Sequence, residues 1–211
     1  MTFLQIINKV LVRLREATVL VSATDEYANL IGEFVNEAKR EVEDAWKWNV
    51  LRQTITVATV DGTSAYSITG SGKRFKIIDI YETTTDTWIT RGNSTRMKAE
   101  IEEGSKGQPH HYYIEGVDSS GDMKIHFSLT PDAVYSYNIN CIVPQGDLVD
   151  ATVLTVPEEP VVLGAYFKAI SERGEDGGTG AQAAGASYNS SMSNAIQLDV
   201  ALTQDEDEWY V

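Results

Sequence analysis

The sequence has few of the residues on which disulfides, metal sites and membrane spans depend. Its single cysteine, Cys141, lies in a strand-like run, so one chain cannot form a disulfide or a cysteine-based metal site. We expect this thiol to be a small buried side chain, since unpaired cysteines are mostly buried and inert. No run approaches the ~18 consecutive apolar residues of a membrane helix. Asn8 and Lys9 interrupt the N-terminus early, which argues against a signal peptide and predicts a cytosol-like compartment.

Basic residues are also scarce. The chain has 17 Lys and Arg against 31 Asp and Glu, a net charge of −14. The imbalance is greatest in residues 157–211, which hold 2 basic and 10 acidic side chains. Tight binding to a nucleic-acid backbone needs clustered Lys and Arg, so this composition argues against it. A channel that surrounds DNA loosely remains compatible, because a negative wall repels the phosphates.

Catalytic signatures are missing as well. His110, His111 and His126 have no further ligands at metal-binding spacing, and there is no G-x-S-x-G elbow. Residues 70–74 (GSGKR) resemble a phosphate loop but lack the Walker spacing, which favours a plain β-turn. Two pairs of adjacent carboxylates, at 102–103 and 158–159, are explained as solvated charges near helix starts. We therefore expect no enzyme activity, no metal and no cofactor.

A long amphipathic stretch from Thr24 to Arg52 organises the rest of the chain. Its apolar residues recur in steps of three and four, which predicts a helix with Thr24 as its N-cap. The apolar stripe comprises Tyr27, Leu30, Ile31, Phe34, Val35, Ala38, Val42, Ala45 and Trp46, with Glu33, Glu37, Lys39, Arg40, Glu41 and Glu43 largely on the other side. The helical pattern ends near Trp46 and Trp48. We predict that these two tryptophans pack where the helix meets a sheet. The alternative is that they lie at an interface between copies of the chain in a ring-shaped oligomer.

Residues 52–143 alternate short strand-like runs with turn residues. The runs are β-branched and aromatic and recur at the roughly 8–12-residue spacing of a small antiparallel sandwich or partial barrel. Asp61-Gly62, after the first run, predicts a hairpin turn. Strands are predicted at Gln53–Val57, Ser64–Ile68, Phe75–Tyr81, Thr87–Ile89, His111–Glu115, Met123–Phe127 and Val134–Val143, with a short helix at Ser94–Glu103.

The two ends of the chain are helical. Phe3–Glu16 has apolar residues at helical spacing and Thr2 as a candidate cap. Near the other end, prolines and acids at 157–160 open a helix, and an Ala- and Ser-rich helix follows at about Ala181–Leu202. We predict an α+β fold: a four-helix core made by N-terminal (1–50) and C-terminal (157–202) helical hairpins, with an inserted antiparallel β-domain at 51–156 and a tail at 203–211.

The tail has the composition of a docking segment. Four acids are followed by two aromatics and a valine: Asp205, Glu206, Asp207, Glu208, Trp209, Tyr210 and Val211. Trp and Tyr are typical anchors for a partner's pocket, and the acids would steer the tail toward a basic rim. A merely disordered end is the alternative.

Four segments of the sequence resemble one protein family. Residues 7–14 (INKVLVRL), 27–31 (YANLI), 35–42 (VNEAKREV) and 46–52 (WKWNVLR) are similar to the head-to-tail adaptors of tailed bacteriophages, also called head-completion or tail tubular A proteins. In that family twelve copies form a ring beneath the portal, with a central channel for DNA. The resemblance implies a non-enzymatic virion protein of the neck, assembled in the host cytoplasm, which meets the portal on one side and the tail nozzle on the other.

The resemblance also assigns roles to parts of this chain. Residues 203–211 would dock on the portal, the β-domain would contact a neighbour or the nozzle, and DNA would pass without specific binding. Two other classes remain open. One is a tail-associated cell-wall hydrolase, which would need converging carboxylates in a cleft. The other is a carbohydrate-binding module with Trp88, Tyr112 and Tyr113 as an exposed platform.

Overall fold

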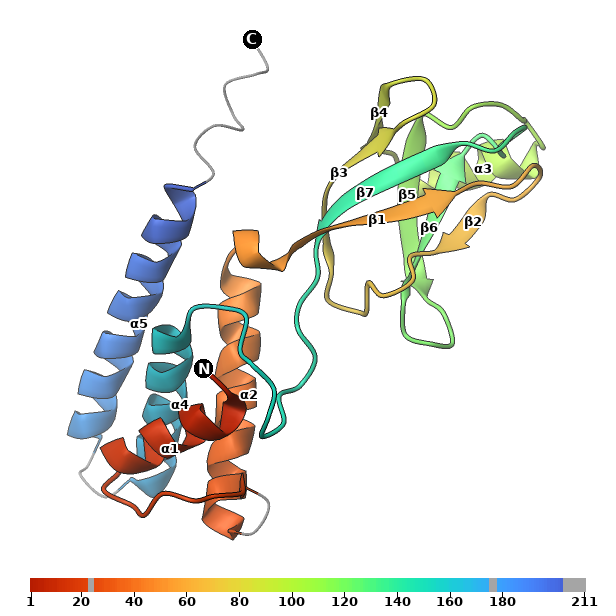
Figure 1. Ribbon diagram of the computed structural model, residues 1–211. Helices are drawn as coiled ribbons and strands as arrows, with labels where there is room; N and C mark the ends of the chain where they lie inside the picture. The colour runs from red at the N-terminus through yellow and green to blue at the C-terminus, as the bar shows by residue number, and fades with distance from the viewer. Residues whose placement is uncertain (23–24, 175–177, 203–211) are drawn as a thin grey trace. The chain divides into compact units, whose positions relative to one another are not determined.

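The computed structural model describes residues 1–22, 25–174 and 178–202. The chain divides into two units, each traced by colour in Figure 1. A helical unit consists of Met1–Leu51 together with the described part of Gln145–Val211, and a β unit consists of Arg52–Pro144. Residues 145–156 therefore cluster with the helices rather than with the strands. No described helix combines the length and the apolar character needed to cross a bilayer.

The helical unit begins with two helices whose starts are capped by side chains. α1 spans Phe3–Arg13, and Thr2 and Gln5 form a reciprocal capping box at its start, which confirms Thr2 as the cap. α2 spans Glu26–Ala45, and the carboxylate of Asp25 accepts a hydrogen bond from the Ala28 amide at 2.8 Å. Thr24, the predicted cap, lies outside the described residues. After α2 a 3₁₀ turn at Asn49–Leu51 leads into the strands.

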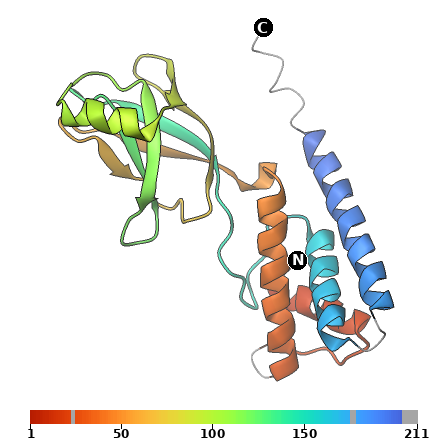
Figure 2. The ribbon, with the colours of Figure 1, turned by 180° about the vertical axis from the view of Figure 1, so that it is seen from behind.

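Two further helices complete this unit. α4 spans Glu158–Arg173 and ends at Gly174, whose left-handed φ of 61° is the conformation that glycine favours at a helix C-terminus. α5 spans Thr179–Val200. Both had been predicted from their prolines, acids and small residues. In Figure 1 and again in Figure 2, which shows the reverse side, α5 runs alongside α4.

The predicted four-helix core is wrong, because only three helices share the apolar interior. α1, α2 and α4 contact one another and supply its large buried side chains, among them Ile6, Ile7, Val35, Val42 and Val161. α5 packs against α4 and buries only Ala184, Ser191 and Asp199. Small side chains allow close approach but bring little apolar area out of water. α5 therefore covers α4 without becoming part of the core.

The β unit is one seven-stranded sheet with a short helix. In spatial order the strands run β1-β7-β3-β4-β5-β6-β2. Their bounds are β1 Arg52–Ala58, β2 Ala65–Ser67, β3 Lys76–Glu82, β4 Thr87–Arg91, β5 His111–Val117, β6 Met123–Ser128 and β7 Ser136–Ile142, and α3 spans Ser94–Glu102. Every strand lies within about two residues of a predicted run.

The sheet is mixed, so the predicted antiparallel β-domain is also wrong. β4 and β5 pair in parallel, with Thr90 opposite His111 and Arg91 opposite Tyr112. Parallel neighbours need a long crossover, and α3 with its flanking loops supplies it. The chain is thus α+β, as predicted, but with three core helices and a mixed sheet.

The expected hairpin at Asp61-Gly62 does not form either. Gly62 has the expected positive φ of 81°, yet β1 pairs with β7 and β2 pairs with β6. The hydroxyl of Tyr66 accepts a hydrogen bond from the Val60 amide at 2.9 Å and donates one to the Thr63 carbonyl at 2.6 Å. These bonds link Tyr66 to the connection between β1 and β2, and the two strands form the two edges of the sheet.

Apolar side chains fill the interior of the β unit. Eleven buried residues form this cluster: Val57, Ile68, Phe75, Ile80, Ile89, Tyr112, Ile125, Phe127, Tyr137, Ile139 and Cys141. The Cys141 thiol is free and buried, as predicted, and burial raises its pKa to about 11. A thiol with so high a pKa is almost entirely protonated near neutral pH, and it is therefore unreactive.

Candidate functional site

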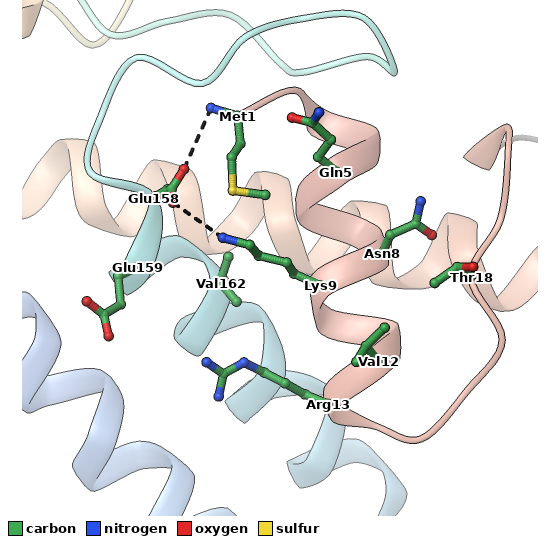
Figure 3. A pocket seen from close by; sticks show the side chains of 10 residues that line it. All are labelled: Met1, Gln5, Asn8, Lys9, Val12, Arg13, Thr18, Glu158, Glu159 and Val162. Atoms are coloured by element: carbon green, nitrogen blue, oxygen red, sulfur yellow. Dashed lines mark hydrogen bonds and ion pairs between the residues drawn. The ribbon is translucent and has the colours of Figure 1, made fainter.

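A hollow in the helical unit lies between α1 and the start of α4 (Figure 3). Its volume is about 1050 Å³. The lining comes from both helices and the segments beside them: Met1, Gln5, Asn8, Lys9, Val12, Arg13, Thr18, Glu158, Glu159 and Val162. It therefore combines charged groups with two valines, a composition suited to contact with another polypeptide.

The charged groups in this hollow are mostly paired with one another. Glu158, in the first turn of α4, accepts a hydrogen bond from Lys9 Nζ at 3.3 Å and lies 3.7 Å from the Met1 amino group. The helix dipole favours a carboxylate at this position. Arg13 lies over the ring of Tyr166 at 6.0 Å. These contacts of the lining residues are thus ion pairs, a hydrogen bond and a cation–π contact that join α1 and the N-terminus to α4.

A second polar cluster lies on α2, where side chains hold the segment that returns from the β unit. We call Asn36, Lys39, Arg40 and Glu43 the α2 clamp. Lys39 Nζ donates to the carbonyls of Gln145 and Gly146, the latter at 2.7 Å. Glu43 accepts a hydrogen bond from the Gln145 amide at 3.0 Å. Neither Lys39 nor Glu43 is exposed to solvent, so their predicted solvent-facing position is wrong.

The other two clamp residues hold the next turn of the same segment. Asn36 accepts a hydrogen bond from the Leu148 amide at 2.8 Å and donates one to the Leu148 carbonyl at 3.3 Å. Arg40 donates to both carboxylate oxygens of Asp147 at 2.8 Å. Residues 145–148 have no regular secondary structure, and these side chains supply the partners that a helix or sheet would otherwise give. Sequence reasoning missed this role; the spacing of Lys39 and Glu43 beside the apolar stripe was the available signal.

The two predicted tryptophans lie at the end of α2. Trp48 is fully buried, and its indole N–H donates to the Val42 carbonyl at 2.6 Å. Trp46 donates to the Asp199 carboxylate at 3.0 Å, and the Asn49 amide donates to the same group at 3.2 Å. Asp199 thus connects α5 to the end of α2. Packing of the tryptophans against a sheet stays a prediction.

The backbone amides of the glycine turn at 70–74 are hydrogen-bonded to a carboxylate of the same chain. The amides of Gly70 and Gly72 donate to Asp122 at 3.1 and 2.9 Å. Amides that already bind a carboxylate are not open to a phosphate. The segment is a turn, as predicted.

The three histidines do not converge on a site. His110 and His111 are exposed, and His111 Nδ1 lies 2.9 Å from the Thr90 hydroxyl. His126 stacks on Tyr113 at 4.8 Å and lies 3.2 Å from Glu115. Burial lowers the pKa of His126, which favours the neutral ring. Across residues 1–22, 25–174 and 178–202, no group of three His, Cys, Asp or Glu side chains could hold a metal ion.

Three other predictions concern an aromatic platform, a pair of carboxylates and the C-terminal tail. Trp88 is 52% exposed and packs on Tyr81, but Tyr112 and Tyr113 are buried, so the three do not form a carbohydrate platform. Glu102 and Glu103 lie at the end of α3 rather than near a helix start. The tail residues 205–211 lie outside the described part of the chain, and their docking role stays a prediction.

The whole sequence matches the model of a known protein family. A family model described as SU10 adaptor protein matches residues 1–211. No curated protein matches the sequence. The matched span is the full length of the chain, so it includes the helical unit, the α2 clamp and the β unit together.

Proposed function

Because the chain belongs to the SU10 adaptor protein family, we propose that it joins the portal of a phage capsid to the tail. Membership confirms the resemblance to phage head-to-tail adaptors and makes the protein a structural component of the virion neck. The whole-chain match is the observation that carries the proposal. The finer roles that follow are supported by particular features of the chain.

The proposed adaptor forms a ring of twelve copies around a channel through which DNA passes. The net charge of −14 supports this role, because an acidic wall repels phosphates and lets the duplex slide. The scarcity of Lys and Arg supports passage without specific binding. The ring would lie between the portal and the tail nozzle.

We assign attachment to the portal to residues 203–211. Their four acids and terminal Trp209-Tyr210-Val211 suit a segment that is steered by charge and anchored by aromatic side chains. In sequence the tail begins two residues after Ala201, the C-cap of α5, and α5 packs against α4. The β unit, with its exposed Trp88, is left for contacts with a neighbour or the nozzle.

The test is to mix the purified chain with the portal protein of the same phage. We expect the free chain to be monomeric and the mixture to show rings on the portal by negative-stain electron microscopy and mass photometry. A chain ending at Leu202 should keep its circular dichroism spectrum and melting temperature but lose attachment. A tail carrying Trp209→Ala and Tyr210→Ala is the matched full-length control. If the intact chain never binds the portal, the proposal is wrong.

A further inference from the structure

The exposed side of α5 carries no charged side chain. Twelve of its residues are exposed, and all are small, amide-bearing or apolar: Thr179, Gln182, Ala183, Ala186, Ser187, Asn189, Ser190, Ser193, Asn194, Gln197, Leu198 and Val200. The one charged residue of this helix, Asp199, is buried and bonded to Trp46 and Asn49. A helix of 22 residues thus presents an uncharged surface along its whole length.

This surface contrasts with the rest of the chain. Charged residues make up 23% of the sequence, and α2, which is two residues shorter than α5, has eight of them. Helices that face water usually carry charged side chains on the exposed side. An uncharged exposed side of this length indicates a surface that is covered in the functional assembly.

The last turns of α5 add exposed apolar side chains. Leu198 is 73% exposed and Leu202, just beyond the helix, is 78% exposed. Both leucines line a hollow of about 380 Å³, whose other lining residues are apolar (Trp48, Pro157, Pro160, Ala195), polar (Ser191, Asn194) and acidic (Glu158, Glu159, Asp199). Exposed leucines at the edge of a recess favour a protein contact over contact with water.

The net charge of the chain indicates which partner covers the exposed side of α5. Two copies, each with a net charge of −14, repel wherever their acidic surfaces meet. The α5 surface lets copies approach without opposing like charges. Its Ala and Ser side chains also allow the short interhelical distances, near 8 Å, that large side chains prevent. We propose that the exposed side of α5 is the lateral contact of the ring, and that its partner is a second copy of this chain.

The inference rests on the proposed function, since it names the surface by which adaptor copies meet. In a closed ring this contact is heterologous: α5 of one copy meets a different surface of the next. A helix of 22 residues is about 33 Å long and about 10 Å wide, so the contact covers roughly 330 Å² per copy, against about 800 Å² in a stable interface. The copies should therefore separate when free and associate once the portal holds them side by side.

The test places charges at two exposed positions on the side of α5 opposite its buried residues. Ala186→Glu/Ser193→Glu should still bind the portal through the tail, but at fewer than half the wild-type number of copies per portal and without a closed ring. Ala186→Gln/Ser193→Gln has side chains of the same size without charge and should assemble more completely than the Glu variant. Equal thermal melting of the three proteins shows that the fold is intact.

A second measurement identifies what α5 touches. Ser193→Cys introduces an exposed thiol, and the only other thiol, Cys141, is buried and unreactive. A benzophenone attached at position 193 should cross-link on illumination to a second adaptor copy in the portal complex. Cross-linking only to the portal, or ring closure by the Glu variant as complete as in the wild type, overturns the inference. Absence of wild-type binding to the portal would instead contradict the proposed function.

Discussion

Lys39 and Glu43 form an ion pair on α2 with Nζ and Oε1 3.2 Å apart and both side chains fully removed from solvent. Burying two charges is expensive unless hydrogen bonds satisfy them. Here the backbone of Gln145 and Gly146 contributes those bonds. The pair therefore positions the returning segment on α2, where a pair of apolar residues would have left its backbone groups without partners.

Removal of one charge from this pair should destabilise the protein strongly. Glu43→Gln leaves the Lys39 ammonium buried without its counter-charge, and we expect a loss of about 3–5 kcal/mol in the free energy of unfolding. Lys39→Met/Glu43→Leu, which removes both charges, should recover part of that loss. Urea denaturation measures all three. Arg40→Gln is the control, since its partly exposed pair with Asp147 should contribute about 0–1 kcal/mol. Equal effects of Glu43→Gln and Arg40→Gln would contradict the role of the buried Lys39–Glu43 pair.

Asp199 should be needed to hold the end of α2 against α5. Asp199→Ala leaves the Trp46 indole N–H and the Asn49 amide without their acceptor, which should cost about 1–3 kcal/mol. Asp199→Asn keeps one acceptor oxygen and should lose less. Thermal melting followed by tryptophan fluorescence reports both the stability and the environment of Trp46. An unchanged melting temperature in the Ala variant would show that these bonds contribute little.

Replacement of two glycines at helix–helix contacts by alanine should have different effects on the stability of the protein. A Cβ at Gly164 would lie 3.0 Å from the Cβ of Ala38, which cannot move without moving α2. Gly164→Ala should therefore destabilise the protein by about 1–3 kcal/mol. The nearest atoms to a Cβ at Gly185 would be on the ring edge of Phe167, at 3.2 Å. A ring can rotate away, so Gly185→Ala should be neutral or gain up to about 1 kcal/mol of helix propensity. Chemical denaturation of the two variants side by side checks the difference.

The stability of the β unit should fall in mildly acidic solution because of His126. Burial lowers the pKa of His126 below its ordinary value of 6.5, so the unfolded chain binds a proton more readily than the folded one. The stabilisation from the neutral ring is complete above pH 6.5 and is lost as the pH falls through the folded value. His126→Gln should flatten the change in melting temperature between pH 7.5 and pH 5. An undiminished change in that variant would assign the pH dependence to other groups.

The sequence by itself determined the places of the helices and strands, because their signals are local. Thr2 and Gln5 lie three residues apart, and their capping box needs nothing beyond the first turn of α1. The β-branched runs of the β unit likewise show their period within a few residues. The family resemblance was also readable in the sequence, since it lay in residues 7–52, and the whole-chain family match confirms it.

The tertiary structure alone decided which of these elements share a core and which polar groups are buried. Lys39 lies beside the apolar stripe of α2 in a helical projection, but the carbonyl that it binds lies more than a hundred residues away in the chain. α5 has the length of a core helix, but its small side chains bury too little area to make it one. The parallel pairing of β4 with β5 depends on the path of α3 between them. The burial of these residues and the pairing of these strands depend on which distant segments come into contact, and local periodicity does not predict those contacts.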